Sequence, residues 1–271
     1  MTAPPSWDAR IRRAETLSRK IPGAREILTF YSAIADFQRE SYAYYTSTRA
    51  PLPPKVDKNA VRGDLPTKVV AKRFLAFLSL VESAAPARLA EFATEFKSKT
   101  DSWEPLLRDY WEKGARFEPV AEERLAFCAR AFLQPYAEYF AKTSGETNPP
   151  LTERLCPVCL GMPQVAVLRP EGEGARRSLV CAFCTNEWMF RRIVCPSCGE
   201  EDEKKLSVYV AKEFDIARVE ACETCASYLI AIDLTKDGHA IPIVDELACI
   251  PLGLWAAGKG YHKLQPNIFG M

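Results

Sequence analysis

The sequence predicts an α+β protein, with a helical N-terminal half followed by a half of short strands organised around paired cysteines. Three observations lead to this prediction. Apolar residues recur at steps of three and four along the first 150 residues. Nine of the ten cysteines come after residue 150, and eight of those nine form four C-x-x-C pairs. The two halves are therefore expected to be stabilised in different ways.

The N-terminal residues, 1–148, are expected to fold as one helical domain. Ile27, Phe30, Ile34 and Phe37 have the spacing of a buried helix face, and similar stripes follow further along. Prolines between the stripes mark helix boundaries, so we expect five or six helices. The polar segment 143–150, closed by two prolines, is typical of a linker and ends the domain.

Beyond this linker, short apolar runs bounded by turn residues replace the helical period. They predict strands at residues 164–168, 178–180, 206–210 and 228–232. We expect a first module at residues 149–192, a second at 193–233, and a C-terminal tail at 234–271 that is partly helical. This division follows an internal repeat in the cysteine spacing.

The four C-x-x-C pairs predict two metal sites with four thiolate ligands each. In such a turn two sulfurs can reach one ion while backbone amides point at them. The first two pairs are 21 residues apart and the last two are 23 apart, whereas only ten residues separate the middle pairs. The repeat therefore groups the ligands within modules. The predicted ligands are Cys156, Cys159, Cys181 and Cys184 in the first module, and Cys195, Cys198, Cys222 and Cys225 in the second.

Four thiolates form a tetrahedral site that suits zinc or a single iron ion, and the spacing does not choose between these metals. Gly199, directly after Cys198, favours a rubredoxin-like turn because glycine readily adopts a positive φ. Leu160, Thr185 and Ala226 hold the equivalent positions and are less diagnostic. Both modules are thus expected to be rubredoxin-like, or zinc-ribbon-like. Iron–sulfur clusters usually require less regular spacing.

Disulfides and a thioredoxin-like redox pair are the competing explanations of the cysteines. Disulfides need an oxidising compartment. The first 13 residues contain Trp7, Asp8 and Arg10 where a secretory signal needs an apolar run, so we expect a cytoplasmic protein. A thioredoxin-like motif is normally single and lies within a βαβ unit. No stretch approaches the roughly 18 apolar residues of a membrane span, so no membrane insertion is expected.

The charge balance argues against a nucleic-acid partner. The chain has 36 basic and 35 acidic residues, and residues 151–271 have 13 and 16, a net charge of −3. Eight thiolates around two divalent ions would bring this half to about −7, the wrong sign for binding phosphates. A local exception is a cluster of four arginines, Arg176, Arg177, Arg191 and Arg192.

The sequence offers no set of residues for ordinary catalysis, so we expect a protein that is not an enzyme. The only histidines are His239 and His262. The segment GLWAAGKG, residues 253–260, is close to a P-loop but ends in glycine where the loop needs Ser or Thr to bind magnesium. Cys128 and Cys249 stand outside the pairs, and their roles stay open.

The order of the C-terminal motifs resembles that of the formate dehydrogenase accessory proteins of the FdhE family. The motifs are CPVC, CAFC followed by Trp188 and Arg192, CPSCG, Glu220 before CETC with Tyr228 and Leu229 after it, and Asp245 through Gly260 and Tyr261. The resemblance is detailed in this half and holds only in outline in the helical half.

This resemblance implies a non-catalytic, cytoplasmic maturation factor. It implies two mononuclear iron sites of the rubredoxin type, with the eight paired cysteines as ligands. It also implies a partner, the catalytic subunit of respiratory formate dehydrogenase, which is bound before its export. Two alternatives remain: a redox protein that passes electrons through Fe(II)/Fe(III) in the same sites, and a zinc-ribbon protein that binds nucleic acid.

Overall fold

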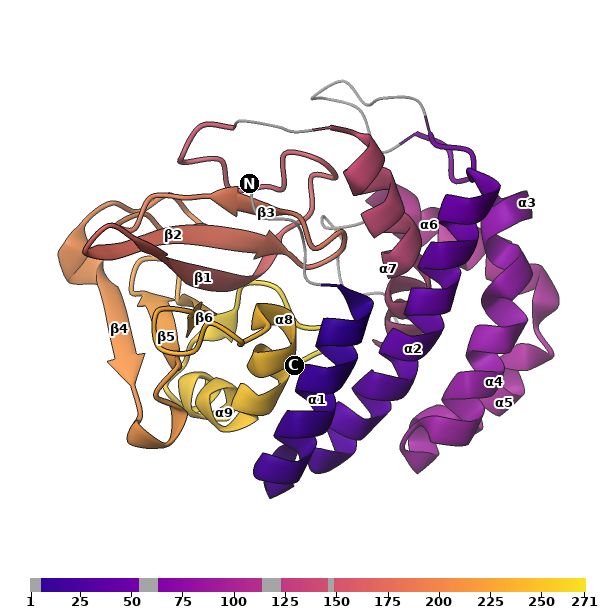
Figure 1. The fold of residues 1–271 in the computed structure, drawn as a ribbon, viewed down its shortest axis with the longest axis horizontal. Coiled ribbons are helices and arrows are strands. Elements are labelled where there is room, and N and C mark those ends of the chain that lie inside the picture. Colours follow the sequence, from indigo (N-terminus) through magenta and orange to yellow (C-terminus); the bar gives the residue numbers. More distant parts are fainter. Residues whose placement is uncertain (1–5, 54–62, 114–122, 146–148) are drawn as a thin grey trace.

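The computed structural model describes residues 6–53, 63–113, 123–145 and 149–271. Helices gather on one side of the molecule and a twisted sheet lies on the other, with two short C-terminal helices packed beneath the sheet (Figure 1). The α+β prediction is therefore confirmed, with helices before the linker and strands after it. No described helix is both long and apolar enough to cross a membrane.

The helical region begins at Ser6, whose hydroxyl caps the first helix by accepting a hydrogen bond from the Ala9 N–H. The longest helix, α2, ends at Arg49, which adopts a left-handed conformation with φ 49°. The helices are α1 (Trp7–Lys20), α2 (Arg25–Thr48), α3 (Thr67–Val70), α4 (Phe74–Ala84), α5 (Ala87–Lys97), α6 (Trp103–Lys113) and α7 (Glu123–Thr143).

The last of these helices, α7, is the centre of the molecule. Every residue from 127 to 140 is buried, because other helices cover one side of α7 and the strand region covers the other. Apolar contacts join it to the bundle, including Phe132 with its ring 4.8 Å from Phe74. This burial includes Arg130, Gln134 and Glu138, so each of these polar side chains needs a partner in the interior.

The strands form one sheet in the order β3-β2-β1-β6-β5-β4, with the short β7 paired to β6. Pairing within β1–β3 and within β4–β6 is antiparallel, whereas β1 and β6 pair in parallel, with Val165 opposite Ile230. The strands are β1 (Pro163–Glu171), β2 (Gly174–Cys181), β3 (Glu187–Met189), β4 (Leu206–Val210), β5 (Ala217–Cys222), β6 (Ser227–Asp233) and β7 (His262–Lys263).

This parallel pairing joins the two cysteine modules into one sheet, which the sequence analysis did not foresee. The pairing follows from the burial of both strands, since the first six residues of β1 and the first six of β6 are buried. Strands that are apolar on both faces need neighbours on both edges and cover on both faces. The modular division of the chain stays a prediction, and residues 146–148 of the linker lie outside the described residues.

The C-terminal residues cover one face of the sheet. α8 (Pro242–Asp245), a 3₁₀ turn (Glu246–Cys249) and α9 (Ile250–Gly258) follow one another here. Arg13 of α1 donates to both carboxylate oxygens of Asp245, at 3.0 Å each from its Nε, and to Asp237 at 2.9 Å. The C-terminal segment that covers the sheet is thereby connected to the first helix, α1.

Candidate metal centres

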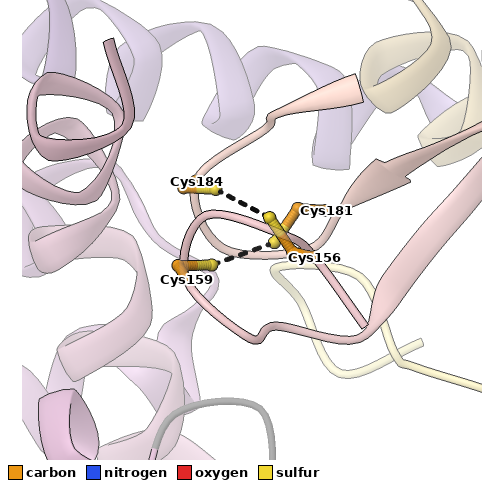
Figure 2. Close-up of side chains that lie close together, drawn as sticks. All are labelled: Cys156, Cys159, Cys181 and Cys184. Carbon is orange, nitrogen blue, oxygen red and sulfur yellow. Dashed lines mark hydrogen bonds between the residues drawn. The ribbon is translucent and has the colours of Figure 1, made fainter. Parts of the chain in front are cut away.

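The structure brings the eight paired cysteines together in two groups of four, grouped as the repeat predicts. Cys156, Cys159, Cys181 and Cys184 form one group, which we call the first centre. Cys195, Cys198, Cys222 and Cys225 form the other, the second centre. In each group the four Sγ atoms all lie within 4.8 Å of one another. Figure 2 shows the first centre, with its sulfurs pointing inward from two facing loops.

The spacing of the sulfurs fits a tetrahedral ion. In the first centre Cys156 and Cys184 lie 3.6 Å apart, and Cys159 and Cys181 lie 3.4 Å apart. The corresponding second-centre distances are 3.8 Å for Cys195–Cys225 and 3.7 Å for Cys198–Cys222. Metal–sulfur bonds of about 2.3 Å in a tetrahedron place the sulfurs about 3.8 Å apart. None of the ten cysteines forms a disulfide, so the disulfide alternative is not realised. Either group could hold a metal ion, and the geometry suits zinc and iron equally.

All four C-x-x-C turns have the same backbone conformation. The residue after each second cysteine has a positive φ: 57° at Leu160, 54° at Thr185, 84° at Gly199 and 53° at Ala226. The expectation for Gly199 is therefore confirmed, and the other three residues adopt the same conformation without being glycine. A left-handed residue without glycine costs roughly 1–2 kcal/mol. The fold accepts this cost three times, since the turn is what aims both sulfurs at one point.

The same turns direct backbone N–H groups at sulfur. The Phe183 N–H points at Cys181 Sγ at 3.4 Å, and the Ser197 N–H points at Cys195 Sγ at 3.3 Å. The Asn186 side-chain amide adds a donor 3.8 Å from Cys156 Sγ. Such donors stabilise the negative charge of a thiolate and strengthen its bond to a metal ion.

The first centre is sealed from solvent. Its four cysteines are at most 1% exposed. Burial raises the pKa of Cys156 and of Cys184 well above the ordinary thiol value. Thiolates at this depth need a cation beside them, so metal binding and loss of the thiol protons must occur together.

The second centre lies at the surface. Cys198 is exposed and Cys225 is partly exposed, whereas Cys195 and Cys222 are buried. Burial raises the pKa of Cys222 to about 12. Burial also acts to raise the pKa of Cys225, but hydrogen bonds from the Ser227 hydroxyl and backbone outweigh it and lower the pKa to about 6. This group therefore already favours one thiolate at neutral pH.

A buried ion pair connects the first centre to the helical region. The Arg10 guanidinium of α1 donates to both carboxylate oxygens of Glu138 in α7, at 2.7 and 2.9 Å. It also reaches the hydroxyl of Thr185 at 3.4 Å. Thr185 is the left-handed residue that follows Cys184. One arginine thus holds two helices and the first centre in a fixed relation.

A second buried arginine makes a parallel connection. Arg130 of α7 donates to the carbonyl of Ala182, between Cys181 and Cys184, and to Gln164 of β1. It also donates to the carbonyls of Pro266 and Asn267 near the C-terminus. Burial lowers the pKa of Arg130, while Tyr110, Cys181 and Glu246 act to raise it. Thiolates at the first centre would therefore favour the charged form of this side chain.

An aromatic contact completes the junction. Phe183, inside the CAFC turn, packs edge-on against Tyr110 and Trp111 of α6, at ring distances of 5.6 and 5.8 Å. Arg10, Arg130, Glu138 and Phe183 were not predicted from the sequence as parts of the site. A usable signal was present, because CPVC and CAFC carry apolar third residues, whereas CPSC and CETC carry Ser197 and Thr224.

At the second centre, polar contacts take the place of the aromatic contacts that Phe183 makes at the first. Glu200, which follows the CPSCG turn, accepts a hydrogen bond from Thr224 of the opposite turn at 2.6 Å and from the N–H of Asp202 at 3.0 Å. These bonds lower the pKa of Glu200 to about 2. On the outer side, Glu223 accepts from the Tyr261 hydroxyl, which lies 3.1 Å from that of Tyr209.

The remaining residues singled out in the sequence lie apart from the cysteine groups or support them. Trp188 is buried and donates to the Glu153 carbonyl at 2.8 Å, which connects β3 to the segment just before the CPVC turn. In the arginine cluster, Arg177 pairs with Glu220 at 2.8 Å and Arg191 with Glu201 at 3.2 Å. Cys128 and Cys249 are buried outside both groups.

Comparison with known protein families identifies two that match this chain. The family model described as FdhE, central domain, matches residues 155–192, and the one described as FdhE, C-terminal domain, matches residues 193–269. The two matches begin just before the first and second cysteine groups. Residues 155–269 therefore have the central and C-terminal domains of the FdhE family.

Individual FdhE proteins extend the similarity to the helical half. An FdhE homologue from Aquifex aeolicus is 26% identical over 271 aligned residues, which cover 96% of this chain and 94% of that protein. One from Pseudomonas aeruginosa is 34% identical over 122 residues, covering 42% of this chain and 38% of that protein. The crystal structure of the P. aeruginosa FdhE protein has the same fold, with a TM-score of 0.69 at 21% identity over 98% of this chain and 96% of that chain. Similarity to FdhE proteins supports a general role in formate dehydrogenase maturation.

Proposed function

We propose that this chain is a non-catalytic, cytoplasmic maturation factor that binds the catalytic subunit of respiratory formate dehydrogenase before its export. The observation that carries the proposal is the coincidence of FdhE family matches with two convergent four-cysteine groups. The eight cysteines are the proposed ligands of two metal ions, with iron as the preferred metal and zinc as the alternative.

The contacts around the first centre support a structural role for it. Its thiolates, its turn amides and the contacts of Arg10, Arg130 and Phe183 fix the sheet against the helices. A bound ion supplies charge neutralisation and a fixed tetrahedral geometry. The helices and the sheet are then held as one rigid body, on which a standard interface of about 800 Å² per partner could form.

The second centre supports the redox alternative through one observation, the exposure of Cys198. An iron ion held there would lie close enough to solvent to exchange electrons with a partner. Purified iron-loaded protein should show a reversible change of its visible absorbance on reduction and reoxidation if this alternative holds. A zinc-only protein, or one with no such change, would exclude it.

Two measurements test the main proposal. Elemental analysis of protein expressed without added metal should find two ions, iron or zinc, per chain; one or none would contradict the two-site assignment. Tagged protein should co-purify with the catalytic subunit from cells that express both. Failure to retain that subunit, with both metal ions present, would overturn the proposed partner.

A further inference from the structure

A cavity of about 440 Å³ opens beside the second centre. Its lining includes Cys195 and Cys222 of that centre, three arginines (Arg177, Arg192 and Arg218) and the carboxylate of Glu220. Apolar side chains complete its walls. It lies on the half of the sheet that is furthest from the helical region, where β4 forms the edge (Figure 1).

The wall formed by β4 exposes apolar side chains. In the register of the sheet, Leu206, Val208 and Val210 lie opposite Cys222, Glu220 and Arg218 of β5, so these six residues share one face. Val208 is 53% exposed and Val210 is 76% exposed. Tyr209 points to the other face, where its ring lies 4.8 Å from that of Trp255 in α9. The helices α8 and α9 therefore leave the Val208 and Val210 face open.

The outer edge of β4 is also open. Among the described residues no strand pairs with β4 on the side away from β5. Natural proteins usually protect such an edge with charged side chains that point outward. Here the strand presents valines to solvent instead. An edge of this kind is suited to pairing with an extended segment of another chain.

The charges of the cavity are separated along β5. Glu220 is shared by Arg177 and Arg218, at 2.8 and 2.5 Å, so these two cations face one carboxylate. Arg192, at the rim, donates to the Ala175 carbonyl at 3.4 Å. The two lining cysteines lie at the other end, since Cys222 is four residues from Arg218, a span of about 13 Å in a strand. The second lining carboxylate, Glu203, is also at that end, three residues before Leu206, which pairs with Cys222. The arginine end carries the surplus positive charge and is complementary to a carboxylate.

Resting on the proposed function, we propose that this cavity and the open edge of β4 are the docking surface for the client subunit. The occupant is an extended segment of that subunit, paired with β4. Because side chains alternate along a strand, the segment carries an acidic residue for the arginine end and apolar residues at alternate positions over Val208 and Val210. Main-chain hydrogen bonds would provide affinity, and the cavity would provide selectivity.

The test compares three variants in binding to the full catalytic subunit. The double variant Val208→Lys/Val210→Lys should weaken binding at least tenfold, since both side chains are exposed and would place charge against the apolar residues of the segment. Arg192→Glu should weaken binding by a similar factor through repulsion of the acidic residue. The matched control is Leu254→Lys, a 69% exposed residue of α9 on the other side of the sheet, and it should bind like the wild type.

Two readouts, the metal content of each variant and its binding of the catalytic subunit, separate the possible outcomes. Two metal ions per chain in every variant would show that the second centre is intact. If the wild type fails to bind the subunit, the proposed function fails. If the wild type binds and the β4 variants bind equally well, the docking surface is wrong while the function stands. If the variants only dissociate a self-associated form, the surface is an interface between copies of this chain, and the proposal is overturned.

A peptide array of the subunit's own sequence sharpens the test. Wild-type protein should bind spots in which an acidic residue alternates with apolar residues, and the Arg192→Glu variant should lose those spots. Retention of the same spots by that variant would contradict the charge assignment.

Discussion

The two cysteine groups have the same backbone turns and nearly the same sulfur spacing, yet their surroundings are opposite. The first centre is enclosed between α1, α6, α7 and the sheet. The second lies at the surface beside a cavity, with Cys198 exposed. The C-x-x-C turns therefore determine the geometry of each cysteine group. The residues between and after the cysteines determine whether that group packs against the helices or lies at the surface.

The largest expected difference between the centres is in global stability. Cys184→Ser should lower the free energy of unfolding by about 5 kcal/mol or more, because a structural metal site contributes folding energy directly. The matched change Cys198→Ser should loosen the second module, lower formate dehydrogenase activity in cells and leave the helical region folded. Urea titration followed by circular dichroism, with a metal count for each variant, checks this. Equal loss of stability in both variants would contradict the structural role of the first centre.

Removing one member of the buried ion pair should have the next largest effect. Glu138→Ala leaves the Arg10 charge buried beside the first centre, and we expect a loss of about 3–5 kcal/mol. The control is Asp8→Ala, which breaks the ion pair between Asp8 and Arg39. The Arg39 side chain is 45% exposed and that of Asp8 is 55% exposed, so the loss should be about 1 kcal/mol or less. Chemical denaturation measures both. A small effect at Glu138 would show that the helices and the first centre are not coupled.

The third residues of the turns offer a matched pair of substitutions. Phe183→Ala removes a ring packed against Tyr110 and Trp111, and should cost about 3 kcal/mol. Thr224→Ala at the same position of the CETC turn removes only the hydrogen bond to Glu200, and should cost about 1 kcal/mol. Thermal unfolding at constant metal loading compares the two. Similar shifts would mean that the two centres do not differ in their coupling to the core.

The smallest expected effect is on the rate of metal release. With excess chelator the second centre should release its ion at least tenfold faster than the first, because the chelator can reach Cys198 directly. Release followed by a metal-binding dye should show two phases of equal amplitude. A single phase would indicate that both centres are equally accessible, in conflict with the burial of the first.

The sequence predicted how the eight paired cysteines group, because the C-x-x-C spacing and its repeat are local properties of the chain. The helical stripe from Ile27 to Phe37 was also readable, and it lies in α2. The parallel contact of β1 with β6 was not predictable in this way, because it joins residues that are 65 positions apart, as Val165 and Ile230 are. The partners of Arg10 and Arg130 likewise depend on how the halves pack. Valine and phenylalanine in the first two turns, against serine and threonine in the last two, were the one local sign of the difference.

The parallel contact of β1 with β6 has a consequence for synthesis on the ribosome. The helices α1 to α7, the strands β1 and β2, and all four cysteines of the first centre emerge before β6 is made. Until then one edge of β1 has no neighbouring strand. The nascent chain can therefore bring the four cysteines of the first centre together early, whereas the sheet is completed only when the final quarter of the chain has left the exit tunnel. A chain that stopped short of β6 would carry an open apolar strand into a crowded cell.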